Sequence, residues 1–110
     1  ESGIVERYAL IVDQAAAGLP VNVFVTITLS RQQQEDLERF EAAVRDVPEV
    51  MECYLMSGED DYLLRVVVAD TADFERLHNQ HLTRLPGVAR VHSGFALRTV
   101  TKRTELPLPG

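Results

Sequence analysis

The chain has 110 residues, of which 45% are hydrophobic and 25% are charged, and its 17 acidic and 11 basic residues give a net charge of −6. This length supports one domain, and the composition is that of a folded globular protein. Nucleic acids are bound mainly through Lys and Arg, so an acidic chain with scattered basic residues is a poor nucleic-acid binder by itself. No apolar run approaches the roughly 20 residues that span a bilayer. The single cysteine, Cys53, fits a reducing cytoplasm.

The two ends of the chain lie outside a repeated pattern. Residues 4–12 are predicted to form a strand, which a loop or short turn connects to Pro20. We therefore divide the chain into a linker strand and loop over 1–20, a main domain over 21–100, and a C-terminal tail strand over 101–110. A lone strand followed by a long connection is unusual at the start of a compact domain, so we expect the chain to be part of a larger one.

The first half of the main domain predicts a strand, a helix and a second strand. Apolar and polar residues alternate over 21–29, the period of a strand with one buried face. Ser30, with Gln33 three residues later, predicts a helix start. Apolar residues then recur at helical spacing until Pro48, which cannot continue a helix. A second strand is expected over residues 50–57.

The second half repeats this pattern and thereby predicts the fold. A strand is expected over 62–69, Asp70 or Thr71 can cap the next helix, and a last strand is expected over 88–99. The helix has an apolar stripe that comprises Phe74, Leu77, His78, His81, Leu82 and Leu85. Two such units in tandem make an α+β, ferredoxin-like (split βαβ) sandwich, with two helices on one face of a four-stranded antiparallel sheet.

The sheet face away from the helices is also expected to be apolar. In the third strand both sets of alternating positions are largely apolar, with Leu63, Val67 and Ala69 on the side opposite Tyr62. An uncovered apolar face of this kind is typical of an interaction surface. We expect a homodimer that packs sheet against sheet.

The turn between the second and third strands is the most informative feature of the chain. Three consecutive acids, Glu59, Asp60 and Asp61, follow Gly58. Because like charges repel, this turn is expected to face water or a ligand, and we interpret it as one wall of a small-molecule site. Asp61 could alternatively cap its own turn, Gly58 could serve only as a turn glycine, and Tyr62 is better explained as a core or interface residue.

Several segments, taken in order, resemble the effector domain of the Lrp/AsnC (feast/famine) transcriptional regulators. They are residues 48–54, Ser57-Gly58, Asp61-Tyr62-Leu63-Leu64-Arg65-Val66, and Leu85-Pro86-Gly87-Val88, together with the tail Arg103-Thr104-Glu105-Leu106-Pro107-Leu108. The start of the chain, residues 2–8, is similar to the linker strand that follows the family's DNA-binding domain. The resemblance covers essentially the whole chain.

This resemblance implies a dimer that often assembles further into an octamer, with an amino acid or related metabolite bound between dimers. The matching effector positions are Leu55, Ser57, Gly58, Asp61, Tyr62 and Ser93. Asp61 would accept a hydrogen bond from the ligand's ammonium group, while Gly58 amides and the two serine hydroxyls would bind its carboxylate. DNA would be bound only through a helix-turn-helix domain absent from this chain, which is then a fragment or, alternatively, a stand-alone effector module.

Other function classes find less support. His78 and His81 could hold a metal but lack a third ligand at a useful spacing, and Cys53 has no activating neighbour. We therefore expect no enzyme, cofactor or metal site. The alternatives are a small dimeric monooxygenase of ferredoxin-like fold, whose pocket-lining Trp and grouped His are missing, and an amino-acid-binding domain of the ACT type. The ACT ligand glycine normally follows the first strand, where this chain has Leu29-Ser30-Arg31.

Overall fold

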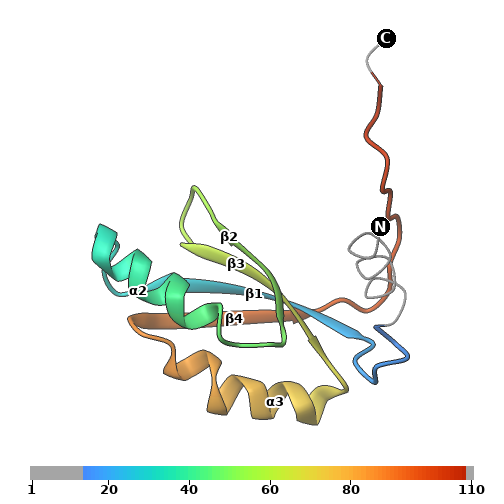
Figure 1. Cartoon of the computed structure of the whole chain (residues 1–110), viewed down its shortest axis with the longest axis horizontal. Coiled ribbons are helices and arrows are strands. Elements are labelled where there is room, and N and C mark those ends of the chain that lie inside the picture. The colour runs from blue at the N-terminus through green and yellow to red at the C-terminus, as the bar shows by residue number, and fades with distance from the viewer. Residues whose placement is uncertain (1–13, 109–110) are drawn as a thin grey trace, which may run out of the picture.

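The computed structural model describes residues 14–108 and contains one four-stranded antiparallel sheet with two helices (Figure 1). The elements in chain order are β1 (Val21–Leu29), α2 (Gln34–Val44), β2 (Val50–Leu55), β3 (Tyr62–Val68), α3 (Thr71–Gln80), a short 3₁₀ helix (Leu82–Arg84) and β4 (Val88–Phe95). The strand order is β2-β3-β1-β4. This arrangement confirms the predicted ferredoxin-like α+β fold. The strand expected over residues 4–12 lies outside the described residues.

Both helices pack on the same face of the sheet (Figure 1). Alternate residues of β1 and β3 point toward them, and these side chains are almost completely buried: Val23, Val25, Ile27, Leu29, Tyr62, Leu64, Val66 and Val68. Phe40 of α2 and Leu77 of α3 complete the same core and are fully buried. The alternate side chains of the strands therefore pack against the apolar stripes of the helices in a single layer.

The first helix begins three residues later than its sequence predicts. Gln33, not Ser30, is the N-cap, and the Gln33 N–H donates to the Asp36 carboxylate at 3.2 Å. Ser30 is held elsewhere, because its N–H donates to the Gly87 carbonyl at 2.8 Å, on the turn that precedes β4. The second helix start is as predicted, since the Asp70 carboxylate accepts from the Asp73 N–H at 2.8 Å.

The strands are shorter than expected at their C-terminal ends. β2 stops at Leu55, β3 at Val68 and β4 at Phe95, and the described part of the tail, residues 101–108, carries neither helix nor strand. In Figure 1 this tail runs away from the sheet. Its leucines, Leu106 and Leu108, are about nine-tenths exposed.

The open face of the sheet is of mixed character. Phe24 and Tyr54 are each about half exposed on this face, but a polar group lies among them. The Arg65 guanidinium donates to the Asn22 side-chain oxygen at 2.8 Å and lies 3.3 Å from the Glu52 carboxylate. The sequence alternation predicted an apolar surface here, and the structure adds a hydrogen-bonded charge pair at its centre.

Candidate functional site

The β2–β3 turn is a narrow connection that is fixed at both ends. The Met56 N–H donates to the Asp61 carbonyl at 2.9 Å, and the Asp61 N–H donates to the Ile27 carbonyl of β1 at 2.9 Å. Between them Gly58 adopts a φ of +123°, which residues with a Cβ rarely adopt. A Cβ built at Gly58 would meet no atom within 4 Å, so the backbone conformation and not crowding requires glycine.

Two of the three turn acids bind the neighbouring strand β1. One Asp61 carboxylate oxygen, Oδ2, accepts from the Leu29 N–H at 2.7 Å and from the Gln32 side-chain amide at 3.3 Å. The Asp60 carboxylate accepts from the Thr28 hydroxyl at 3.1 Å. Among the described residues no donor binds the other Asp61 oxygen, Oδ1. The turn therefore fixes the position of the Asp61 carboxylate through one of its two oxygens.

Tyr62 lies in the core and not in the turn. Its side chain is 1% exposed, its ring stacks on Phe40 with centroids 4.4 Å apart, and its hydroxyl donates to the Glu41 carboxylate at 2.6 Å. Burial, followed by the hydrogen bond to the Glu41 carboxylate and its charge, raises the pKa of Tyr62 above its usual value, so the phenol is neutral at physiological pH. This placement agrees with the interpretation of Tyr62 as a core residue.

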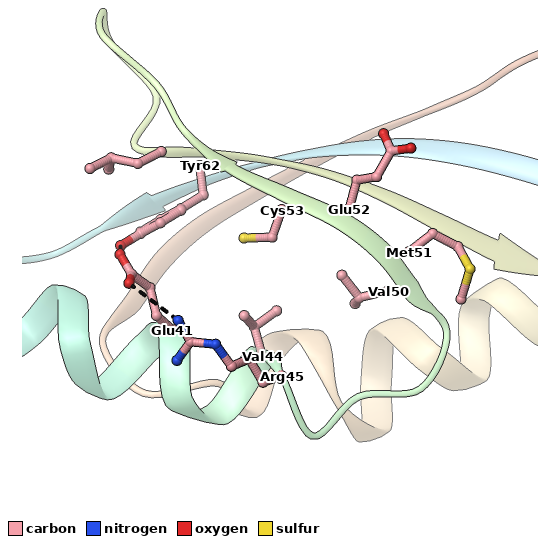
Figure 2. Close-up of a pocket in the computed structure, with 9 residues that line it drawn as sticks. Glu41, Val44, Arg45, Val50, Met51, Glu52, Cys53 and Tyr62 are labelled. Atoms are coloured by element: carbon pink, nitrogen blue, oxygen red, sulfur yellow. Dashed lines mark hydrogen bonds and ion pairs between the residues drawn. The ribbon is translucent and has the colours of Figure 1, made fainter. Parts of the chain in front are cut away.

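A cavity of about 500 Å³ opens between α2 and the edge strand β2 (Figure 2). Glu41 of α2 and Arg45, the C-cap of this helix, form its charged side, with 3.9 Å between their nearest charged atoms, and Glu52 lies on the β2 side. The apolar residues of the lining are Val44, Val50, Met51 and Leu55, and Cys53 also lines the cavity. Two of the predicted effector residues, Leu55 and Tyr62, contribute to this cavity.

Cys53 is half buried in this cavity, and its thiol is unreactive at neutral pH. Burial, and secondarily the nearby Glu41 carboxylate, raise the pKa of the Cys53 thiol to about 11, against a partial opposing effect of Arg45. The thiolate is the reactive form of cysteine, so this thiol is a weak nucleophile at neutral pH. This raised pKa agrees with the expectation that Cys53 is not an activated nucleophile.

The structure separates Ser93 from the other predicted site residues of the same protomer. Ser93 lies on the helix-facing side of β4, in a groove that it shares with Phe74, His78 and Phe95. The His78 ring lies 6.0 Å from that of Phe74, which agrees with a packing role for this histidine. Within residues 14–108 no three His, Cys, Asp or Glu side chains gather as a metal site requires. Nor is any helix in that range long and apolar enough to cross a membrane.

Several residues of the site were not predicted from the sequence. Gln32 and the Leu29 N–H bind Asp61 across 29 and 32 residues of sequence, and Glu41 meets Tyr62 across 21. Glu41 and Arg45 carried one signal, because their i,i+4 spacing places them on one side of the helix. No local sequence pattern identifies Tyr62 as the sheet residue that binds Glu41.

Comparison with known proteins identifies the family to which this sequence belongs. A family model described as the Lrp/AsnC ligand binding domain matches residues 22–106. An HTH-type transcriptional regulator of Sinorhizobium fredii is 47% identical over 100 residues, which are 91% of this chain and 79% of the relative. The Bkd operon transcriptional regulator of Pseudomonas aeruginosa is 39% identical over 108 residues, which are 98% of this chain and 71% of the relative.

Solved structures show the same fold. A transcriptional regulator of Neisseria meningitidis in complex with L-Met superposes with a TM-score of 0.77 at 31% identity, over 86% of this chain and 60% of that one. An AsnC family transcriptional regulator from Agrobacterium tumefaciens gives a TM-score of 0.76 at 35% identity, over 96% of this chain and 72% of that one. The prediction of an effector-sensing regulatory domain is thereby confirmed. The chain belongs to the Lrp/AsnC family of transcriptional regulators and comprises its ligand-binding domain.

Proposed function

We propose that this domain senses an amino acid through the β2–β3 turn and converts its binding into a change of assembly, without catalysing a reaction. The observation that carries the proposal is the state of the Asp61 carboxylate. Oδ2 is held by the Leu29 N–H at 2.7 Å, while Oδ1 has no donor among the described residues. A carboxylate that is fixed in position through one oxygen can accept a charge-assisted hydrogen bond from an ammonium group at the other.

The rest of the turn suits the other end of an amino acid. Gly58 is exposed, and no atom lies within 4 Å of the position that a Cβ would take, so its backbone can come close to a ligand, while Ser57 adds a hydroxyl donor. Leu55, 59% exposed at the end of β2, offers an apolar contact for a ligand side chain. The Neisseria regulator was crystallised with L-Met, which supports an amino-acid effector for this chain.

The other two predicted residues take different roles in this proposal. Tyr62 supports the turn from the core instead of touching the ligand. Ser93 lies in a separate groove of its own protomer, so it would reach a ligand only from a neighbouring subunit. A site between dimers, as the family resemblance implies, would bring the two together.

The assembly that we propose begins with a homodimer through the open sheet face, where Phe24 and Tyr54 are exposed, and extends to an octamer of four dimers. In this scheme residues 1–20 form a linker, 21–100 the effector domain and 101–110 a tail. DNA contact would come from a helix-turn-helix domain outside residues 1–110, and the regulator would act in the cytoplasm. The HTH-type name of the Sinorhizobium relative supports this division.

The test is the light-scattering mass of the chain with and without each of a panel of amino acids, including methionine and leucine. We expect one amino acid to change the mass of the wild type and to have no effect on Asp61→Asn, which keeps an acceptor for Leu29 but loses the charge. The matched control is Glu59→Gln, which removes a charge from the same turn at a residue without a hydrogen-bond partner among those described. A mass that no amino acid changes, or an equal response of Asp61→Asn, would overturn the proposal.

A further inference from the structure

The cavity between α2 and β2 has the two features that an amino acid needs, a charged side and an apolar side. It is distinct from the proposed site at the β2–β3 turn. Its charged side at α2 holds Glu41 and, four residues later at the C-cap of the helix, Arg45. Glu52 of β2 also lines the cavity but pairs with Arg65 at 3.3 Å. The opposite side of the cavity is apolar, with Val50 and Leu55 of β2 and Val44 of α2. Figure 2 shows Val44, Val50 and Cys53 directed into the space between helix and strand, with Glu41 and Arg45 at one end.

The charged pair is loose enough to admit a ligand. The closest Glu41 and Arg45 atoms are 3.9 Å apart, at the limit of an ion pair, and the Arg45 side chain is 72% exposed. Exposed pairs of this kind contribute little to stability, so separating them is easy. Glu41 is the more fixed member, because its second oxygen accepts the Tyr62 hydroxyl at 2.6 Å. An arriving ammonium group would therefore find a positioned carboxylate, and an arriving carboxylate a mobile guanidinium.

We infer that this cavity is a second binding site, one for a zwitterionic amino acid with an aliphatic or thioether side chain. The ammonium group would bind Glu41, the carboxylate would bind Arg45, and the side chain would lie against Val44 and Val50. A ligand with a single charge would make only one of these two charged contacts. The zwitterion replaces the internal pair with two charge-assisted contacts.

The position of Tyr62 links this site to the proposed effector turn. Tyr62 contributes to the cavity wall and follows Asp61 directly in the chain. A ligand that draws Glu41 toward its ammonium group changes the acceptor of the Tyr62 hydroxyl, next to the residue that fixes the turn. Occupation of one site is therefore expected to change affinity at the other, by the same factor in both directions. This coupling rests on the proposed function of the turn, but binding in the cavity does not.

Cys53 provides a direct readout, because it is the only cysteine of the chain and lies in the cavity. We would measure its alkylation by iodoacetamide in the whole chain near pH 8, where methionine and leucine are zwitterions, with and without each of these amino acids. Isoamylamine and 4-methylpentanoate serve as probes with one charge each. We expect the amino acids to slow alkylation, and each single-charge probe to require at least about a tenfold higher concentration for the same effect.

Three variants separate the cavity from the turn. Arg45→Gln and Glu41→Gln should each raise the amino-acid concentration needed for protection about tenfold or more, since each removes one charged contact. Arg39→Gln is the matched control, as Arg39 lies on α2 with an exposure similar to that of Arg45 and, among residues 14–108, pairs with Asp36 alone. Asp61→Asn should keep full protection even though it abolishes the proposed response of the turn.

The outcomes are distinguishable from failure of the proposed function. Protection that persists in Asp61→Asn and is lost in Arg45→Gln supports a cavity site, whether or not the mass of the protein responds to amino acids. Equal protection by isoamylamine, or protection unaffected by Arg45→Gln, would overturn the assignment of a zwitterion. No protection by any amino acid at millimolar concentration would overturn the site itself.

Discussion

The Asp61 carboxylate accepts a 2.7 Å hydrogen bond from the backbone N–H of Leu29, which joins the β2–β3 turn to the end of the central strand β1. Leu29 is 2% exposed, so its N–H has little access to water. One oxygen of this carboxylate thus completes the backbone hydrogen bonding of β1, and in the proposed function the other accepts from the ligand. Substitutions at Asp61 are therefore expected to affect both the stability of the fold and the proposed ligand response.

Replacing Asp61 with Ala is expected to destabilise the fold by about 1–3 kcal/mol, since the Leu29 N–H loses a charged acceptor in a buried position. Asp61→Asn should cost less, because its amide oxygen still accepts. Urea unfolding followed by circular dichroism measures the difference. Glu59→Ala, in the same turn, should stay within about 0.5 kcal/mol of the wild type. A loss as large in Glu59→Ala would show that the turn charge, and not the bond to Leu29, matters.

Gly58→Ala is expected to destabilise the protein by about 1–3 kcal/mol although the space for a methyl group is free. The cost comes from the φ of +123°, which alanine rarely adopts. Ser57→Ala, one residue earlier, is the control and should have little effect. If Gly58→Ala were as stable as the wild type, the turn would have changed conformation, and the ligand response should then be lost.

Sequence patterns predicted the fold because helix stops and strand periods agree in both halves of the chain. They misplaced the first helix start because Ser30 and Gln33 both head a capping pattern. A distant contact, the bond from Ser30 to the Gly87 carbonyl, decides between them. Local rules carry no information on such contacts.

The site shows the same limit. The acidic turn could be read from the sequence because Gly58 and the three acids are contiguous. The Asp61–Leu29 and Glu41–Tyr62 bonds depend on strand register and on the rotation of α2 over the sheet. Neither quantity is encoded locally, so the cavity between α2 and β2 could not be predicted.

The raised pKa of Cys53 predicts slow and strongly pH-dependent alkylation. With a pKa of about 11 against the ordinary 9.0, the thiolate fraction at neutral pH is about a hundredfold lower than in the unfolded chain. The rate for the folded protein should therefore rise until about pH 11, whereas the rate in urea should level off near pH 9. Equal rates in both states at neutral pH would show that the thiol is neither buried nor held near Glu41.

The bond between Tyr62 and Glu41 predicts a loss of stability at high pH. The folded pKa of Tyr62 is raised above that of an unfolded tyrosine, so its contribution is fully present below about pH 10 and declines as the pH rises above that value. Tyr62→Phe should cost about 1–2 kcal/mol at neutral pH, and this difference should shrink above pH 10. A double-mutant cycle with Glu41→Gln tests whether the hydroxyl acts through Glu41, and additive losses would contradict it.

The last prediction concerns the proposed sheet-to-sheet dimer. Phe24, 44% exposed, lies at the middle of the open face on the central strand β1, beside the Arg65 group. Phe24→Asp would bury a carboxylate in the dimer interface, which costs several kcal/mol without a partner, and should reduce the mass from dimer to monomer. Met51→Asp is the matched control, since Met51 is 48% exposed but lines the cavity beneath α2. A monomer from Met51→Asp and a dimer from Phe24→Asp would place the interface at the β2 edge and not on the open face.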